Sequence, residues 1–189
     1  YLMLGDIYFT KLFIAQAITS FEKSAALDPA NITAQLKLAE LFLYLKKYQN
    51  CLDHADNALR IDRTNAKAYF IKGLCFKENG DTGLAVSSFR TCIEQDPDYF
   101  HAYMQLGDIF ALQNNPIAID YYTNAINVNG SMVEAYYGLA YFYQEHGAPE
   151  KAIEVYDDLL KVDPRNAPAK HNIGYTYLFK LNDPGKAVN

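Results

Sequence analysis

The hydrophobic residues of this chain recur with a period of 33 or 34 positions. The segment "YLMLGDIYF" at residues 1 to 9 returns as "YMQLGDIFA" at residues 103 to 111, three periods of 34 further on. Each period holds a small residue with an aromatic residue three positions later. The small residues are Gly5, Ala39, Gly73, Gly107, Ala140 and Gly174, and the aromatic residues are Tyr8, Phe42, Phe76, Phe110, Tyr143 and Tyr177. Offsets of three and four positions share one helical face, so each period is predicted to begin with a helix.

A second apolar pattern follows in each period and predicts a second helix. Its small residues are Ala17, Cys51, Ala85, Ala118 and Ala152. Most periods then end in a breaker pair such as Asp28-Pro29, Asp96-Pro97 or Asp163-Pro164, because proline cannot continue a helix. Two short helices cannot bury their apolar faces alone, but they can do so by stacking on the next pair. We therefore predict an all-α solenoid of antiparallel helix pairs.

These features resemble the tetratricopeptide repeat family, which has a period of about 34 residues. Residues 100–132 match its pattern at Tyr103, Leu106, Gly107, Phe110, Ala118, Tyr122 and Ala125. The resemblance covers the whole chain as a single domain of five and a half repeats, with units 1–31, 32–65, 66–99, 100–132, 133–166 and a partial unit 167–189. It implies a right-handed superhelix whose concave groove, lined by the first helices, holds a segment of another protein.

The resemblance also implies which residues line the groove. Transferred position by position, they are Leu36, Glu40, Tyr44, Lys67, Phe70, Leu74, His101, Met104, Asp108, Tyr137, Tyr141 and Tyr175. This aromatic lining with acidic interruptions suits an apolar or amphipathic peptide or helix that carries a few basic residues. The alternative for each aromatic residue is that it fills space between repeats. We expect a non-catalytic scaffold or adaptor that binds another protein.

Composition narrows the range of partners. The chain of 189 residues is 50% hydrophobic and 21% charged, and it has a formal net charge of -5 and a pI near 5.3. An acidic chain without basic runs has no general attraction for phosphate backbones, so we expect no nucleic-acid partner. No apolar stretch reaches the roughly 18 residues needed to span a bilayer.

Candidate chemistry is sparse. The histidines His54, His101, His146 and His171 fall in different units without ligand spacing, and no Ser or Cys lies in a nucleophile motif. We therefore expect no catalytic site, no metal and no cofactor. Three cysteines without metal-site spacing are predicted to be reduced thiols. Reduced thiols favour the cytoplasm, while a bacterial periplasm or envelope location stays open.

Two alternatives to a free-standing adaptor stay open. Both ends look truncated, which would fit the repeat arm of a larger multidomain enzyme or assembly factor. RNA binding by a related helical repeat is the other alternative, although such repeats carry basic grooves. The last unit lacks most of its second helix and leaves Tyr177, Leu178 and Phe179 uncovered. We therefore expect a homodimer through this uncapped C-terminal end.

Overall fold

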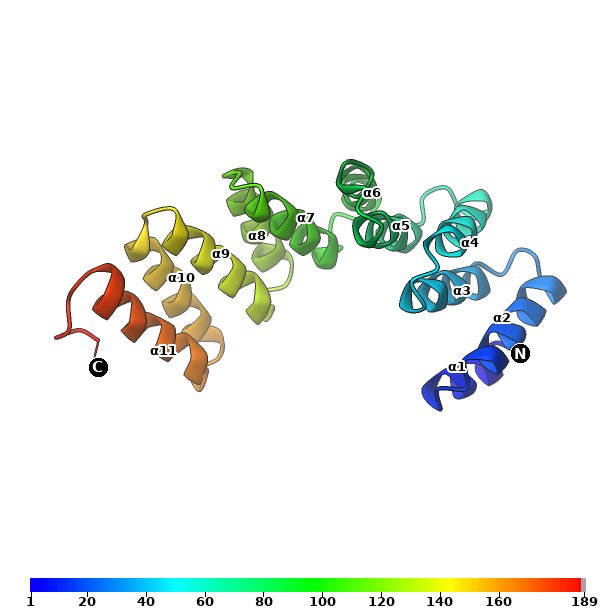
Figure 1. Ribbon diagram of the computed structural model, residues 1–189, viewed down its shortest axis with the longest axis horizontal. Coiled ribbons are helices and arrows are strands. Elements are labelled where there is room, and N and C mark those ends of the chain that lie inside the picture. Colours follow the sequence, from blue (N-terminus) through cyan, green and yellow to red (C-terminus); the bar gives the residue numbers. More distant parts are fainter. Residues whose placement is uncertain (188–189) are drawn as a thin grey trace. The chain divides into compact units, whose positions relative to one another are not determined.

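The structure is a computed structural model, and it describes residues 1–187. Every regular element within this range is helical, which confirms the predicted all-α fold (Figure 1). The helices are α1 (Leu2–Thr10), α2 (Ile14–Leu27), α3 (Ile32–Tyr44), α4 (Tyr48–Ile61), α5 (Ala66–Glu78), α6 (Thr82–Gln95), α7 (Phe100–Leu112), α8 (Ile117–Val128), α9 (Val133–Glu145), α10 (Pro149–Val162), α11 (Ala167–Tyr175) and the π-helical turn η1 (Thr176–Lys180). No helix in this range is long and apolar enough to cross a membrane.

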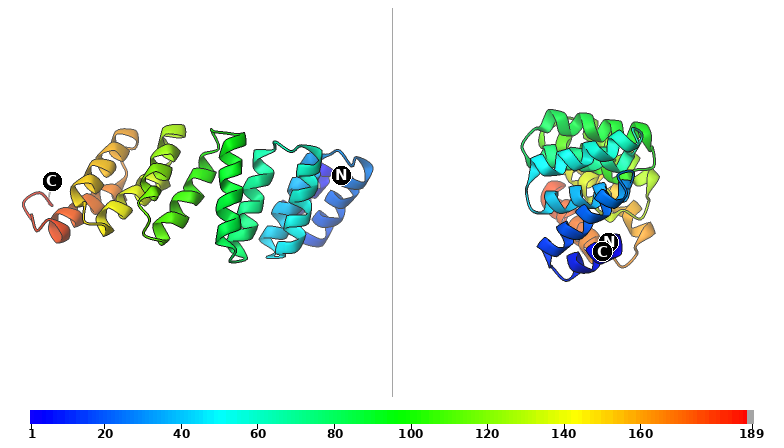
Figure 2. Two further views of the ribbon diagram at one scale, coloured as in Figure 1. Left: turned by 90° about the horizontal axis from the view of Figure 1, so that it is seen from above. Right: turned by 90° about the vertical axis from the view of Figure 1, so that its right-hand side faces the viewer.

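Consecutive helices pack in antiparallel pairs. α1 packs on α2, α3 on α4, α5 on α6, α7 on α8 and α9 on α10 (Figure 2). The first helices of the later pairs, and α11, begin at Ile32, Ala66, Phe100, Val133 and Ala167, where the predicted units begin. Contacts of α2 with α3, α4 with α5, α8 with α9 and α10 with α11 join neighbouring pairs. Stacking of this kind buries the faces that one pair leaves open.

The turns between pairs stop one helix and start the next. Asp62 is the extended C-cap of α4, and its Oδ1 accepts a hydrogen bond from the backbone N–H of Thr64 at 2.9 Å. Asn65 is the N-cap of α5, and its Oδ1 accepts from the backbone N–H of Ala68 at 3.0 Å. Asn31 and Asn166 cap α3 and α11 in the same way. Each Asn satisfies one N–H group that the first turn of a helix leaves free.

The recurring small residues lie where the two helices of a pair approach. A Cβ atom added to Gly73 would lie 2.5 Å from Cε1 of Phe89, and one added to Gly107 would lie 2.7 Å from Cδ1 of Tyr122. Ala140, at the equivalent position of α9, is 0% exposed. The small residue and the aromatic residue opposite it therefore pack as one unit.

The chain divides into two compact units, Tyr1–Pro97 and Asp98–Asn189. The core of the first unit includes Phe21, Leu38 and Leu41, and the core of the second includes Tyr156 and Leu159. Each unit therefore has a core of its own.

A disulfide joins Cys51 of α4 to Cys75 of α5, whose Cα atoms are 6.7 Å apart. The prediction of three reduced thiols is therefore wrong for these two residues. Only the stacking of the second helix pair on the third brings them together, since they are 24 residues apart in the chain. Cys92 remains a free, buried cysteine in α6. Burial raises the pKa of its thiol to about 12, so the thiol stays protonated and unreactive at neutral pH.

Candidate functional site

The predicted groove residues of the first unit lie on two first helices. They are Leu36, Glu40 and Tyr44 on α3, and Lys67, Phe70 and Leu74 on α5. Leu36 is 8% exposed and belongs to the core, so it has little surface to offer a ligand. Phe70 is half-buried, with its ring centroid 5.6 Å from that of Phe89. Lys67 Nζ lies 2.7 Å from Glu40 Oε1, and this ion pair links α3 to α5.

Tyr44 and Leu74 meet at one end of α3 and α5. Together with Leu43, Lys46, Tyr48 and Glu78, they line a pocket of about 290 Å³, which we call the Tyr44 pocket. Tyr44 is 62% exposed, and its ring meets that of Phe9 edge-on at 6.1 Å. Sequence reasoning missed Lys46 and Tyr48, because it considered only first helices and these residues lie in the following turn and at the start of α4.

The predicted groove residues of the second unit are partly used by its own fold. They are His101, Met104 and Asp108 on α7, Tyr137 and Tyr141 on α9, and Tyr175 on α11. Met104 is 8% exposed and lies in the core. Asp108 Oδ1 accepts a hydrogen bond from the Tyr122 hydroxyl at 2.9 Å. The Tyr137 hydroxyl donates to Oδ1 of Asn166, the N-cap of α11. These contacts give Asp108 and Tyr137 structural roles in addition to any contact with a ligand.

Three aromatic residues of the second unit are exposed. Tyr141 is 63% exposed, Tyr175 is 45% exposed and Phe179 is 66% exposed. The ring centroids of Tyr175 and Phe179 are 4.8 Å apart. Tyr141 and Tyr175 each follow the recurring small residue directly, so they hold equivalent positions in consecutive repeats. We call Tyr141, Tyr175 and Phe179 the aromatic surface. His101, which is also exposed, lies with its ring 4.0 Å from that of Phe100.

The two units differ in charge. Residues 1–97 contain eleven basic and eleven acidic side chains, whereas residues 98–189 contain six basic and eleven acidic side chains. The formal net charge of -5 therefore belongs entirely to the second unit. An acidic surface attracts basic ligands and repels acidic ones.

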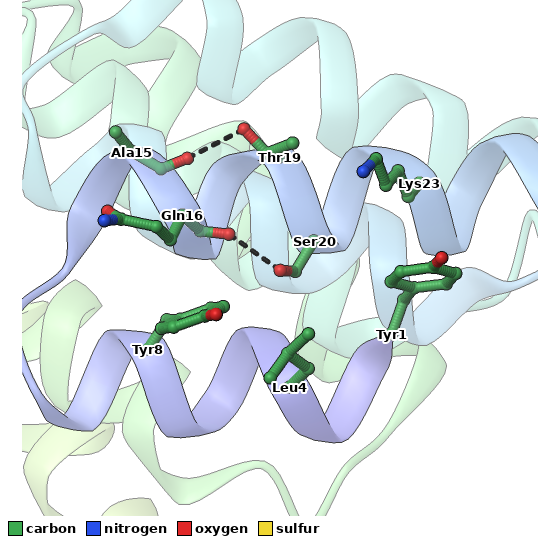
Figure 3. A pocket seen from close by; sticks show the side chains of 8 residues that line it. All are labelled: Tyr1, Leu4, Tyr8, Ala15, Gln16, Thr19, Ser20 and Lys23. Atoms are coloured by element: carbon green, nitrogen blue, oxygen red, sulfur yellow. Dashed lines mark hydrogen bonds between the residues drawn. The ribbon is translucent and has the colours of Figure 1, made fainter.

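The first helix pair has an open face with a pocket of about 310 Å³ (Figure 3). Leu4 and Tyr8 of α1 point toward α2, and Lys23 Nζ of α2 lies 5.7 Å from the centre of the Tyr1 ring. Leu4 is 40% exposed, whereas its equivalent in the next repeat, Leu38, is 1% exposed in α3, which packs on α2. Leu4 therefore lies on an open face of the first helix pair, whereas α2 packs on the helix that carries Leu38.

Burial is the main cause of the large pKa shifts within residues 1–187. Burial, and secondarily the Asp108 carboxylate, raises the pKa of Tyr122 well above its ordinary value, so the hydroxyl stays protonated. Burial lowers the pKa of His54, whose Nδ1 lies 2.8 Å from Gln35 Oε1. Within residues 1–187, no three His, Cys, Asp or Glu side chains are close enough to hold a metal ion. The arrangement offers contact surface and pockets.

Comparison with protein families identifies the repeat. Models described as "Tetratricopeptide repeat" match residues 66–99 and 110–170. The first match coincides with α5 and α6, and the second runs from the end of α7 into α11. The chain belongs to the tetratricopeptide repeat family. Its fold is that of a protein-interaction scaffold, and tetratricopeptide repeat proteins bind other proteins.

Two curated relatives are much longer than this chain. BBSome complex member BBS4 of Bos taurus is 32% identical over 90 residues, which are 48% of this chain and 17% of the relative. Protein bimA of Emericella nidulans is 24% identical over 165 residues, which are 87% of this chain and 20% of the relative. The chain thus spans only 17% and 20% of the length of these two proteins.

Solved structures share the tetratricopeptide fold. MamA superimposes with a TM-score of 0.75 at 23% identity, over 89% of this chain and 99% of MamA. YrrB, described as a tetratricopeptide repeat protein with an unusual peptide-binding site, superimposes with a TM-score of 0.69 at 22% identity, over 89% of this chain and 87% of YrrB. At these identities the likeness shows the fold alone.

Proposed function

We propose that this chain is a non-catalytic scaffold that holds a peptide or helical segment of another protein against its first helices. The observation that carries the proposal is the exposure of Tyr141 and Tyr175 in the second unit, which are 63% and 45% exposed, and, separately in the first unit, of Tyr44, which is 62% exposed. All three belong to the lining that the repeat pattern predicts. Exposed tyrosines on rigid helices supply large contact areas at low cost in side-chain entropy, and such residues often dominate binding.

The charge of the second unit specifies the ligand further. Its aromatic surface lies in a unit that carries the formal net charge of -5. A segment with basic side chains on one face and apolar side chains on the other would complement both features. The proposed partner segment is therefore a basic amphipathic helix or an extended peptide of the same composition.

The test uses a labelled amphipathic peptide of Lys, Leu and Ala as the probe. We expect Tyr141→Ala combined with Tyr175→Ala to weaken binding about tenfold or more, because two contact tyrosines are removed. Tyr137 is left unchanged, since its hydroxyl bonds to Asn166 and its loss would disturb the start of α11. The control is Leu84→Ala, an apolar side chain 53% exposed on a second helix. Equal binding by the wild type, the double variant and the control would contradict the proposal.

A second candidate is the repeat arm of a larger enzyme or assembly factor. This candidate is favoured by the small fraction of BBS4 and bimA that the chain spans, 17% and 20%. Determining the complete reading frame tests it directly. A frame that encodes a catalytic domain next to the repeats would support this candidate. A frame that encodes repeats alone would contradict it.

We also propose self-association through the face of α11 and η1. Leu178 is 40% exposed and Phe179 is 66% exposed, and both line a pocket of about 360 Å³ together with Tyr175. Light scattering over a range of concentrations should show a dimer that Phe179→Glu reduces to a monomer. A monomer at every concentration for the unchanged chain would contradict self-association.

A further inference from the structure

The Cys51–Cys75 disulfide lies beside the Tyr44 pocket. Cys51 is in the first turn of α4, whose first residue, Tyr48, lines the pocket. Cys75 is in the last turn of α5 and directly follows Leu74, which lines the pocket from the other side. Both cysteines are 0% exposed. The disulfide thus fixes the start of α4 to the end of α5, which are two of the walls of the pocket.

At two other places where neighbouring helix pairs stack, the equivalent positions pair a small residue with a large one. Where α2 packs on α3, these positions hold Ala17 and Leu41, and where α8 packs on α9, they hold Ala118 and Phe142. All four side chains are buried. Where α4 packs on α5, two residues of middle size, Cys51 and Cys75, replace the small and large pair. Two cysteines fill a similar volume and can also form a bond.

The rest of α5 is held by buried side chains, including Ala68 and Ile71, and by two ion pairs. Lys67 Nζ near its start lies 2.7 Å from Glu40 Oε1 of α3, and Lys72 Nζ near its middle lies 2.7 Å from Asp56 Oδ1 of α4. The disulfide adds a covalent tie near the end of the helix. Reduction would therefore leave α5 attached over most of its length. It would release mainly the end that lines the pocket.

We propose that the Cys51–Cys75 disulfide is a redox-sensitive latch that keeps the Tyr44 pocket ordered, and that reduction loosens the pocket. The order of the pocket can be measured without any ligand. A consequence for partner binding rests on the proposed scaffold function. Failure of the latch and failure of ligand binding are therefore distinguishable.

The chemistry requires an oxidant of the small-molecule disulfide class. One cysteine thiolate attacks a sulfur of that disulfide, forms a mixed disulfide and releases one small thiol. The second cysteine thiolate attacks the protein sulfur of the mixed disulfide, so that the Cys51–Cys75 bond forms and a second small thiol leaves. The two cysteines lose two electrons and two protons, and the small disulfide gains them. Because both cysteines are buried, exchange requires local opening of the α4–α5 edge.

The experiment measures amide hydrogen exchange by mass spectrometry on the full chain. One sample is treated with oxidised glutathione and the other with dithiothreitol. We expect residues 43–48 and 74–78 to exchange about tenfold or more faster after reduction, because the local closed state loses its covalent tie. Segments of α9 and α10 in the second unit should exchange at the same rate in both samples.

Two variants isolate the effect of the latch. Cys51→Ala combined with Cys75→Leu copies the Ala17 and Leu41 pair and cannot form the bond. It should fold and show the same exchange in both samples. Cys92→Ala removes the free thiol and should keep the difference between them.

Three results would each overturn the latch. One is the labelling of all three cysteines after the glutathione-treated chain is unfolded without reductant, since no disulfide would then exist. Another is equal exchange of the oxidised and reduced wild type at the pocket. The last is a response to reductant that persists in the Ala and Leu double variant.

Discussion

At the residue scale, this fold depends on the absence of side chains at a few positions. The ring of Tyr122 lies over Gly107 of its own pair and also over Gly138 of the next pair. A Cβ atom would come within 2.7 Å of the ring at Gly107 and within 2.6 Å at Gly138. Gly73 and Phe89 form a similar contact in the first unit. These aromatic rings fill the space that each glycine leaves. A larger residue in place of the glycine would therefore require a smaller residue in place of the ring.

Gly107→Ala should destabilise the second unit by about 1 to 3 kcal/mol, since the added methyl group overlaps the buried Tyr122 ring. Chemical denaturation monitored by circular dichroism measures the change. Gly83→Ala in α6 is the matched control, because a Cβ atom there meets nothing within 4 Å. Gly83→Ala should raise the free energy of unfolding by a few tenths to about 1 kcal/mol, because alanine has a higher helix propensity than glycine. Equal effects of the two substitutions would contradict the packing account.

His54 should make stability depend on pH. Its ring stacks on that of Phe42, with 5.4 Å between the ring centroids. Burial lowers its pKa below the ordinary value of 6.5, although the negative charges of Asp53 and Glu22 act to raise it. The unfolded chain therefore binds the proton more tightly than the folded chain. The contribution of neutral His54 to the free energy of unfolding should be complete above about pH 6.5. The free energy of unfolding should decrease as the pH falls below that value, because the unfolded chain then takes up the proton more readily. Denaturation at several pH values should show a smaller decrease for His54→Gln, and an identical decrease would contradict the assignment.

At the element scale, the turn inside each helix pair uses one residue with positive φ. Gly80 and Gly147 adopt φ of 91° and 73°, which glycine accepts readily. Leu12, Lys46 and Asn114 adopt φ of 59°, 56° and 53° at the corresponding turns. Left-handed backbone costs a side chain such as leucine or lysine about 1 to 2 kcal/mol. The family pattern thus sets the turn geometry even where the local residue disfavours it.

Leu12→Gly should stabilise the first unit by about 0.5 to 1 kcal/mol, because relief of the left-handed strain exceeds the added chain entropy of glycine. Leu12 is 69% exposed, so little burial is lost. Its neighbour Lys11, with φ of -89°, provides the control. Lys11→Gly should lower stability by about 0.5 to 1 kcal/mol, since it adds entropy without relieving strain. Thermal unfolding of both variants measures their stabilities relative to the unchanged chain. A loss of stability in both would contradict backbone strain at Leu12.

At the scale of the whole molecule, two units of the same architecture have different surfaces. The first is formally neutral and contains the disulfide and the Tyr44 pocket, whereas the second carries the formal net charge of -5 and the aromatic surface. Repeats share their buried positions because stacking demands them, while exposed positions are free to differ. The same fold thus presents two chemically distinct contact surfaces.

Binding of the Lys, Leu and Ala peptide should weaken as salt increases, because ions screen attraction to the acidic second unit. Calorimetry at about 0.05 M and about 0.5 M salt measures the change, and we expect a loss of several-fold or more. A peptide with Glu in place of Lys should bind more weakly at low salt. Binding that is independent of salt and of peptide charge would contradict an electrostatic contribution.

The sequence by itself determined the repeat period, the helix pairs and the starts of the first helices. These follow from local rules, since helical spacing, breaker residues and small residues act within one pair or between neighbouring pairs. Asp62 and Asn65 stop and start helices by contacts a few residues away, and these too can be recognised in the sequence. The disulfide was not predicted, because Cys51 and Cys75 are 24 residues apart and only the stacking of neighbouring helix pairs brings them together.

Only the tertiary structure decided which predicted groove residues are accessible. Leu36, Met104, Tyr44 and Tyr141 all lie on first helices, yet Leu36 and Met104 are buried in the cores, while the two tyrosines are exposed. Only the tertiary structure shows that Lys46 and Tyr48 also line the Tyr44 pocket. Helical periodicity gives the direction of a side chain from its own helix axis. Its accessibility and bonding depend on the atoms that other elements place around it.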